Sequence, residues 1–568
     1  MRRPTTDDLE RANELAAQLR LRATGLALPE TVIHAASLAA VLVAVFSPVA
    51  GTLTVVAVAA VMLLVGAGAR RFQRPRLDNG LRVARILLSA ALAVAAPAAA
   101  APAALLALVA LGELPLARAE IVARPAMANV AGVRHRRSLP GGGVLAITTA
   151  CIGVAGALLL LDARAGWIWI PAGVAALVTA LKAFGDLVRI RDRHRQDARV
   201  GGILAELAPR FAVYWDGEPG TAYQLAMWTP NLDALRRPYV VIVRDPDMLD
   251  EAAAATRSPV FVRIRHSDLD EMVVPGMTSA FYVNNALSNA NFVRFPGIWH
   301  LQLNHGDSGK APSFNPSMRM YDRDFVAGPA AIERFAEHGI DTRPGFFEIV
   351  GRPQTAAVST TPRRPDGAVE RVLYAPTWAG FNADTAHSSL IAGPDIVREL
   401  IRREQTVWFR PHPNTRLNDE LERSAGEVRR ILREDRDANG RQHVFDDPPA
   451  HTLFEMFDAS DALITDVSSV LSDYLATGKP YAISSMLQPA ELFSELSPVA
   501  QGGYVFTPDA RSITAAVDAL LGPDPARAAR EGLRAEVLGT AVAPDPAAAF
   551  AEAALRYVDA AKGAAGTR

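Results

Sequence analysis

The sequence is poor in cysteine and carries almost no net charge. One cysteine, Cys151, stands among 568 residues, which excludes an intramolecular disulfide and a cysteine-built zinc or iron–sulfur site. The 59 basic and 60 acidic side chains leave a formal net charge of −1, which argues against nucleic acid as a partner. Neither a GxGxxG nor a GxxxxGK(S/T) phosphate loop occurs, so a dinucleotide oxidoreductase and a P-loop ATPase lose their main support. No cluster of carboxylates marks a Mg²⁺ site, and we expect no metal.

Charged residues are also missing from long stretches of the N-terminal third. Residues 31–69 contain no Asp, Glu, Lys or Arg and are about twice as long as one membrane-crossing helix needs. The stretch 86–112 is uncharged as well, and 143–161 and 165–181 are apolar runs separated by a short polar turn. Proline or glycine near the centre of the first two stretches breaks each of them. The pattern therefore predicts three helical hairpins, that is, about six transmembrane segments.

The distribution of arginine predicts how these segments are oriented. Arginine is concentrated before, between and after the predicted hairpins, whereas the turn within each hairpin carries at most one, Arg164. The positive-inside rule places the arginine-rich segments in the cytoplasm. We therefore expect a multi-pass protein of the plasma membrane with both termini inside, a cytoplasmic segment at 1–28 and a transmembrane domain at 29–184. The arginine-rich segments are 2–22, 70–85, 118–137 and 182–199.

Two other interpretations of the apolar stretches remain. They could be buried helices of a soluble protein, or they could belong to a transporter. Intramembrane polar residues such as His34 would suit transport, but one histidine without an interior acidic relay gives it little support.

From about residue 200 the composition is that of a mixed α/β enzyme. Short β-rich runs alternate with segments that can form helices, which predicts parallel sheets packed between helices. We expect two Rossmann-like lobes at 200–345 and 346–568, the second with a closing helix over 546–561. The predicted strands are Phe211–Trp215, Tyr239–Val243, Val260–Ile264, Ala280–Val283 and Trp299–Leu303, followed by Arg371–Tyr374, Thr406–Phe409, His443–Phe445, Ala462–Thr465 and Tyr481–Ser484.

The strongest local signal is the run from Asp461 to Pro480. An apolar strand ends at Thr465 and a helix begins near Ser468, so Asp466, Ser468 and Ser469 lie where a parallel strand meets a helix N-terminus. The unpaired amides and the helix dipole at such a place favour an anion. The alternative is that Asp466 and Ser468 simply cap the helix.

Two further motifs follow predicted strands of the same lobe. In Phe409-Arg410-Pro411-His412-Pro413, prolines hold His412 in an extended turn, and Arg410 offers a forked cation suited to phosphate oxygens. In Tyr374-Ala375-Pro376-Thr377-Trp378, the hydroxyl of Thr377 can face the same cleft. The alternative for His412 and Arg410 is a solvated surface loop.

A fourth motif lies in the first lobe, after the run Trp299–Leu303. An alternating strand delivers His305 to a glycine-containing loop with Lys310 nearby, a setting that suits a general base beside an anion-binding cation. The alternative is a loop with an incidental histidine. With His305 on one lobe and Arg410, His412, Ser468 and Ser469 on the other, the set indicates a nucleotide-diphosphate transferase.

The order His-Gly, Tyr-Ala-Pro-Thr-Trp, Arg-x-His-Pro and Asp-x-Ser-Ser, followed by Asp-Tyr and Lys-Pro, resembles the CDP-glycerol glycerophosphotransferase family of teichoic-acid polymerases and primases. The resemblance covers roughly 280–485. It implies a two-lobed GT-B fold, CDP-glycerol as donor substrate, no cofactor, a lipid-linked polyol-phosphate acceptor and release of CMP. Asn304 stands where the family usually has Trp, Ala379 where Arg often follows the Trp, and Val467 where Tyr is usual.

The resemblance also assigns roles to residues. His305 and His412 are the catalytic candidates, with His305 as base, and the expected donor phosphate-binding residues are Arg410, Asp466, Ser468, Ser469, Thr377 and Lys310. We therefore expect a membrane-anchored transferase that moves glycerol phosphate or another polyol phosphate from a CDP-activated donor to a lipid-linked acceptor. The alternatives are a sugar-nucleotide GT-B glycosyltransferase and an inactive membrane scaffold.

Overall fold

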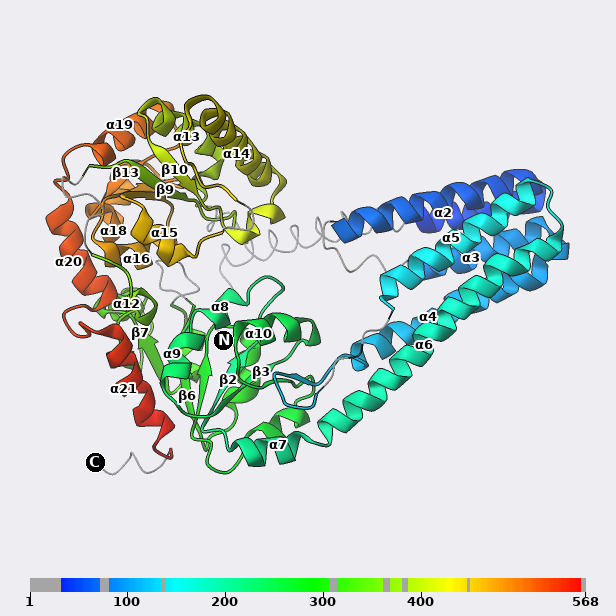
Figure 1. Cartoon of the computed structure of the whole chain (residues 1–568), viewed down its shortest axis with the longest axis horizontal. Helices are drawn as coiled ribbons and strands as arrows, with labels where there is room; N and C mark the ends of the chain where they lie inside the picture. Colours follow the sequence, from blue (N-terminus) through cyan, green and yellow to red (C-terminus); the bar gives the residue numbers. More distant parts are fainter. Residues whose placement is uncertain are drawn as a thin grey trace, which may run out of the picture. The chain divides into compact units, whose positions relative to one another are not determined.

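The computed structural model describes residues 32–71, 81–133, 136, 139–305, 314–360, 368–380, 387–446 and 450–562. The expectations for segment 1–28 and for Lys310 lie outside these residues. The chain forms two compact units: one comprises Met1–Ala126 and Gly132–Arg199, and the other comprises Met127–Ala131 and Val200–Arg568. Figure 1 shows the first unit in blue and cyan and most of the second in green to red.

The first unit consists of helical hairpins. The chain reverses at Ser47, where a Cβ atom on Gly51 would lie 2.5 Å from Ala44 Cα, so only glycine allows the two helices to approach so closely. Short turns likewise connect α3 to α4 and α5 to α6. The helices are Val32–Phe46, α2 (Pro48–Arg71), α3 (Leu81–Ala95), α4 (Ala100–Val122), α5 (Gly141–Leu160) and α6 (Trp169–Asp197).

Four helical stretches of this unit are long and apolar enough to cross a membrane, namely Pro48–Val65, Pro97–Val122, Gly141–Leu160 and Ala165–Asp197. Val32–Phe46 is apolar but shorter, and α3 has 15 residues, or about 22 Å. Length and composition thus support membrane association through four helices. α3 lies against α4 and α5 against α6, whereas α2 lies mainly against α5.

The interior of the helical unit holds ion pairs that the sequence analysis did not anticipate. Arg85 and Glu113 are buried and lie 2.5 Å apart, and Arg85 also donates to Thr148 Oγ1 at 2.6 Å. Lys182 Nζ lies 2.6 Å from the buried Asp186 Oδ2. Glu113 and Asp186 are thus buried acidic groups of this unit. Each acid has a basic partner, which is what burial of a charge requires.

The second unit begins with an α/β lobe whose sheet has the order β1-β4-β3-β2-β5-β6-β7-β8. All neighbours pair in parallel except β1 and β4. The strands are β1 (Met127–Ala128), β2 (Phe211–Trp215), β3 (Tyr239–Val243), β4 (Val260–Val262), β5 (Ser279–Tyr282), β6 (Trp299–Gln302), β7 (Arg323–Val326) and β8 (Phe347–Ile349). Its helices are α7 (Val200–Leu207), α8 (Tyr223–Ala226), α9 (Thr229–Ala234), α10 (Leu249–Ala255), α11 (Ala290–Val293) and α12 (Pro329–Glu337).

Strand β1 lies in the arginine-rich segment 118–137, which we expected to be a cytoplasmic connection within the transmembrane domain 29–184. Met127 pairs with Phe261 and Ala128 with Val260 of β4. Asn129, in left-handed conformation at φ 56°, donates from Nδ2 to Thr256 O at 2.7 Å. The connection between α4 and α5 is therefore an edge of the first lobe, and the expected single domain is interrupted there.

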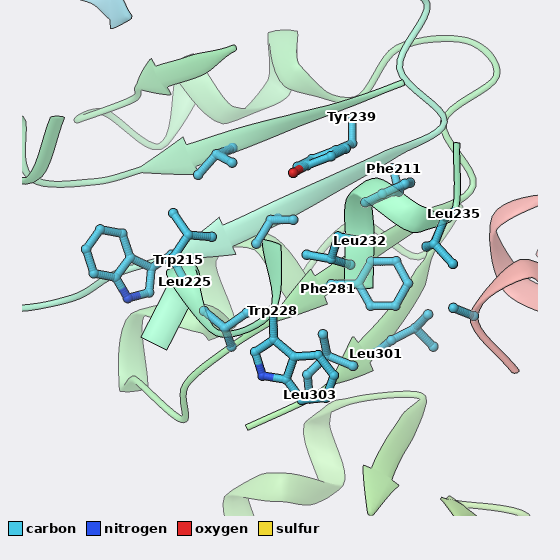
Figure 2. Close-up of a cluster of buried hydrophobic side chains, with 14 of the residues drawn as sticks. Phe211, Trp215, Leu225, Trp228, Leu232, Leu235, Tyr239, Phe281, Leu301 and Leu303 are labelled. Carbon is cyan, nitrogen blue, oxygen red and sulfur yellow. The ribbon is translucent and has the colours of Figure 1, made fainter. Parts of the chain in front are cut away.

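The core of the first lobe is built from one face of the sheet and the helices that cover it. Phe211 stacks on Tyr239 with ring centroids 4.8 Å apart, and Trp228 packs against Phe550 at 5.2 Å. Figure 2 shows how Trp228 lies beneath the strands with the leucines of neighbouring elements. The cluster is Phe211, Trp215, Leu225, Trp228, Leu232, Leu235, Tyr239, Phe281, Leu301 and Leu303.

The closing helix packs on the first lobe, although it follows the second in sequence. In α21 (Pro546–Val558), Phe550, Ala554 and Val558 are buried in the core of the first lobe. β8 also belongs to that lobe's sheet. The expected second lobe of 346–568 is therefore too long at both ends.

The second lobe has a parallel sheet of order β10-β9-β11-β12-β13. Successive residues of β9 face opposite cores: Val372 and Tyr374 lie on one side, Leu373 and Ala375 on the other. The predicted strand His443–Phe445 is reduced to one bridge between Trp408 and Val444. The strands are β9 (Arg371–Ala375), β10 (Thr406–Phe409), β11 (Ala462–Thr465), β12 (Tyr481–Ser484) and β13 (Tyr504–Phe506).

Helices cover both faces of this sheet. One face packs against α13 (Gly393–Arg402), α14 (Asp419–Asn439) and α19 (Ala510–Leu521). The other packs against α15 (Leu453–Ala459), α16 (Ser469–Tyr474), α17 (Ala490–Leu496), α18 (Pro498–Gln501) and α20 (Arg527–Leu538). The expectation of two parallel α/β lobes is confirmed by this arrangement.

Candidate active site

Hydrogen bonds of Asp466 connect the carboxyl ends of several strands of the second lobe. Its carboxylate accepts from Thr377 N at 2.7 Å, Ser484 Oγ at 2.7 Å and Ser389 N at 3.1 Å. The side chain is fully buried, and burial raises the pKa of Asp466 while these hydrogen bonds oppose the rise. The oxygens of Asp466 are thus engaged with protein donors, and the side chain holds the loops that contribute them.

Ser468 and Ser469 begin α16, directly after the loop that follows β11. Ser468 is the N-cap residue in extended conformation, yet its side chain makes no capping hydrogen bond. Its Oγ is buried without a hydrogen-bond partner among the described residues. The alternative that Ser468 and Asp466 merely cap the helix is therefore not what the structure shows. A buried hydroxyl at the start of a helix fits a ligand oxygen.

His412 and Arg410 follow β10 at the same edge of the sheet. The Nδ1 atom of His412 accepts from Asn414 N at 3.0 Å, which in the neutral ring leaves the proton on Nε2. Arg410 Nη1 donates to His451 O at 2.7 Å, and burial lowers the pKa of the Arg410 guanidinium. Both residues therefore lie in the loop that follows β10, His412 in a fixed ring orientation.

Thr377 and Trp378 connect these two motifs. Thr377 is buried and donates its backbone N–H to Asp466, and the ring of Trp378 stacks on His412 with centroids 5.9 Å apart. Because β10, β9 and β11 are neighbours in the sheet, their loops meet at one edge. The structure thus brings together Thr377, His412, Asp466 and, through the loop after β11, Ser468.

His305 lies just past β6 of the first lobe. Its ring meets Tyr223 edge to face, and its Nδ1 atom is buried without a hydrogen-bond partner among the described residues. Burial, together with the positive charge of Arg352, lowers the pKa of His305 to about 4. The imidazole is therefore neutral near pH 7, and the same burial and charge that keep it neutral make it a weaker base than an exposed histidine. Asn304, at φ 56°, sets the turn that presents it.

Sequence reasoning missed the ion pair between Arg352 and Asp473. Arg352 follows β8, and its Nε lies 2.6 Å from Asp473 Oδ1 on α16, with both side chains buried. The guanidinium thus contacts the helix that begins at Ser469 and also influences His305 electrostatically. An Arg-Pro pair directly after a strand was the available signal, but only the fold reveals its partner.

The described residues contain no group of three or more His, Cys, Asp or Glu side chains that could hold a metal ion. Arg410 follows β10, and the carboxylates of Asp466 and Asp473 are engaged by backbone and hydroxyl donors and by Arg352, respectively. This donor set suits an anionic ligand such as a diphosphate.

Comparison with known proteins finds that part of the second lobe matches a known protein family. Residues 353–486 match the family described as CDP-Glycerol:Poly(glycerophosphate) glycerophosphotransferase. This segment contains Thr377, Arg410, His412 and the Asp466–Ser469 loop, whereas His305 lies before it. No curated protein matches the chain.

Several solved structures are similar to this chain at low sequence identity. The putative UDP-N-acetylglucosamine 2-epimerase from Listeria monocytogenes is 13% identical and covers 61% of this chain and 95% of that one, with a TM-score of 0.43. The wall teichoic acid polymerase TagF is 12% identical and covers 65% and 95%, with a TM-score of 0.41. A glycosyltransferase from Rickettsia africae is 11% identical and covers 61% and 97%, with a TM-score of 0.39.

Proposed function

From a chain whose residues 353–486 belong to the CDP-glycerol:poly(glycerophosphate) glycerophosphotransferase family, we propose a membrane-anchored transferase that moves glycerol phosphate, or another polyol phosphate, from a CDP-activated donor to a lipid-linked acceptor. The family match carries this proposal, because it spans every second-lobe motif that surrounds the candidate anion site. The product is a teichoic-acid-like polymer of the cell wall.

The donor diphosphate binds at the carboxyl edge of the second-lobe sheet. Arg410 and His412 Nε2 supply donors from one loop, and Ser468 and Ser469 supply hydroxyl and backbone donors from another. The pairing of His412 Nδ1 with Asn414 supports this role, since it directs the ring proton toward the opposite side. Asp466 acts as a positioning residue that holds the loops in register.

In the mechanism that we propose, His305 removes a proton from an acceptor hydroxyl, and the resulting oxygen attacks the β-phosphorus of the donor. A new P–O bond to the acceptor forms while the bond to CMP breaks, and CMP leaves with the electron pair. Near pH 7 His305 is neutral and has a ring nitrogen able to take the proton, although its low pKa makes it a weaker base than an exposed histidine. Fixed donors at the diphosphate offset the charge that develops on CMP.

The membrane half anchors this reaction at the cytoplasmic face. Large apolar side chains face outward from the helices, among them Leu64, Leu108 and Phe184, which are 73%, 64% and 68% exposed. Such exposure suits lipid rather than water. β1 lies between α4 and α5 and pairs with the first lobe, so the connection before α5 and the lobes after α6 share one side. This supports an even number of crossings by α5 and α6.

The test is incubation of the purified full chain with CDP-glycerol, other CDP-alditols and UDP-sugars, with nucleotide release as the readout. We expect CMP release from a CDP-alditol in the presence of a lipid-linked acceptor, and its loss in His305→Ala. Release of UDP from a UDP-sugar instead would favour a glycosyltransferase. Release of no nucleotide from any donor would favour the inactive scaffold.

A further inference from the structure

A cavity at the end of α6 lies outside the transferase motifs. Its volume is about 550 Å³, and its walls come from α6 and from the segment that follows β1. Three arginines and one aspartate are among its lining residues. The lining residues are Gly132, Val133, Arg136, Asp192, Arg195, Gln196 and Arg199.

The walls of this cavity are fixed by hydrogen bonds. Gln196 is buried and accepts from Ala126 N at 2.9 Å, and Arg193 Nη1 donates to Arg124 O at 3.0 Å. These bonds hold the end of the α4 connection against α6. Gly132 stands at φ 73°, and a Cβ atom there would lie 3.9 Å from Arg199 Nη2, so this part of the backbone lies beside the Arg199 guanidinium. The cavity is therefore a built feature of the helical unit.

The charge of the cavity is positive. Arg136 Nε lies 3.0 Å from Asp192 Oδ2, and Arg195 Nη1 lies 3.8 Å from Asp192 Oδ1, so two arginines share one carboxylate. No ion pair of Arg199 is found among the residues that the structure describes. Arginine is suited to phosphate because its planar fork can donate two parallel hydrogen bonds. The excess of two guanidinium groups favours an anion.

The position of the cavity along α6 indicates which kind of anion can reach it. Leu187, 65% exposed, is the last large apolar residue that faces outward on this helix. Asp192 and Arg195 lie about 8 and 12 Å farther along the axis. The polar headgroup region adds about 5–8 Å to each side of the hydrocarbon core, and arginine side chains can extend toward it. The cavity thus lies within reach of lipid phosphates.

We infer that this cavity binds the phosphate headgroup of an anionic membrane lipid and so holds the helical unit at an acidic bilayer surface. The inference rests on the proposed membrane anchoring, but it needs no transferase activity. Arg136, Arg195 and Arg199 contact the phosphate, and Asp192 limits the net attraction.

The experiment titrates the full chain in neutral detergent with dioctanoyl-phosphatidylglycerol and measures binding by native mass spectrometry. We expect saturable binding, about tenfold weaker in Arg136→Gln/Arg199→Gln. The matched control is Arg191→Gln, an exposed arginine of α6 outside the cavity, which should bind as the unmodified chain does. Asp192→Asn should bind the lipid more tightly, because it removes the competing carboxylate.

Separate arms use dioctanoyl-phosphatidylcholine and inorganic phosphate. Weak binding of the zwitterionic lipid is the expected result. Displacement of phosphatidylglycerol by inorganic phosphate at a similar concentration would identify a site for free phosphate and overturn the lipid assignment. Equal lipid affinity in Arg136→Gln/Arg199→Gln and in Arg191→Gln would overturn the site itself. Lipid binding without nucleotide release would contradict the proposed transferase and leave this inference standing.

Discussion

At the scale of single residues, His305 decides whether the first lobe contributes a base. Its replacement by alanine should lower kcat by about 10²–10⁴ with little change in donor affinity, because a general base acts on the transition state. Steady-state kinetics together with CDP-glycerol binding would separate the two effects. Near-normal kcat in His305→Ala would leave this histidine as a structural part of its loop.

The low pKa of His305 sets the sign of the pH dependence. A base is active in its unprotonated form, and a pKa of about 4 keeps His305 unprotonated at all higher pH values. On this account kcat/KM stays level from about pH 6 to 8 and falls as the pH approaches 4. A fall that begins near pH 6.5 would instead indicate a histidine in ordinary surroundings.

Arg352 offers a second prediction at this scale. Breaking a buried ion pair from one side costs about 3–5 kcal/mol, whereas replacing both partners with apolar groups is often nearly neutral. Arg352→Met should therefore lower the melting temperature clearly, and Arg352→Met/Asp473→Leu should recover much of the loss. In that double variant the positive charge beside His305 is gone, so the pKa of His305 rises and the acid limb of kcat/KM moves to higher pH.

At the scale of elements, the start of α16 should discriminate CDP from CMP. Each lost hydrogen bond to a charged oxygen is worth about 1.5–3 kcal/mol, so Ser468→Ala/Ser469→Ala should weaken CDP binding at least about tenfold and CMP binding much less. Because Ser468 makes no capping bond, the melting temperature should change little. Isothermal titration with both nucleotides and thermal unfolding measure these effects.

The control for this pair is Ser494→Ala, which removes an exposed hydroxyl bonded to Ala490 O on α17. It should leave CDP affinity unchanged. A drop in melting temperature with unaltered CDP affinity in the Ser468→Ala/Ser469→Ala variant would contradict diphosphate binding at the start of α16. It would show that the two serines have a structural role only.

At the scale of the whole molecule, the arginine distribution and β1 both bear on topology. Engineered cysteines at positions 75 and 130 should be protected from a membrane-impermeant thiol reagent in intact cells, and one at 163 should be labelled. Position 75 lies outside the described residues, whereas 130 directly follows Asn129 beside the first lobe. Cys151 is buried and serves as the internal background. Labelling at 130 would indicate that the two lobes lie outside the cell, which would contradict a transferase that uses a cytoplasmic donor.

The sequence by itself determined most of the segments that form the two sheets and the loops that carry polar side chains, but it did not indicate β1, β7, β8 or β13. Runs such as Tyr239–Val243 and Ala462–Thr465 appear in the structure at the predicted residues, because buried parallel strands are nearly continuous apolar runs bounded by turn residues. The loops after β9, β10 and β11 follow from the same pattern, since proline and glycine act locally. Strands of two or three residues, such as β1 and β13, are too short to leave a periodic signal.

Only the tertiary structure decided how distant segments meet. Asp466 receives its hydrogen bonds from residues 18, 77 and 89 positions away, and β1 pairs with a strand more than a hundred residues later. The closing helix packs on the first lobe, and Arg352 reaches Asp473, for the same reason: burial of apolar area and pairing of buried charge depend on the folded neighbourhood. A local pattern specifies which surface a segment must bury, but it does not specify the partner.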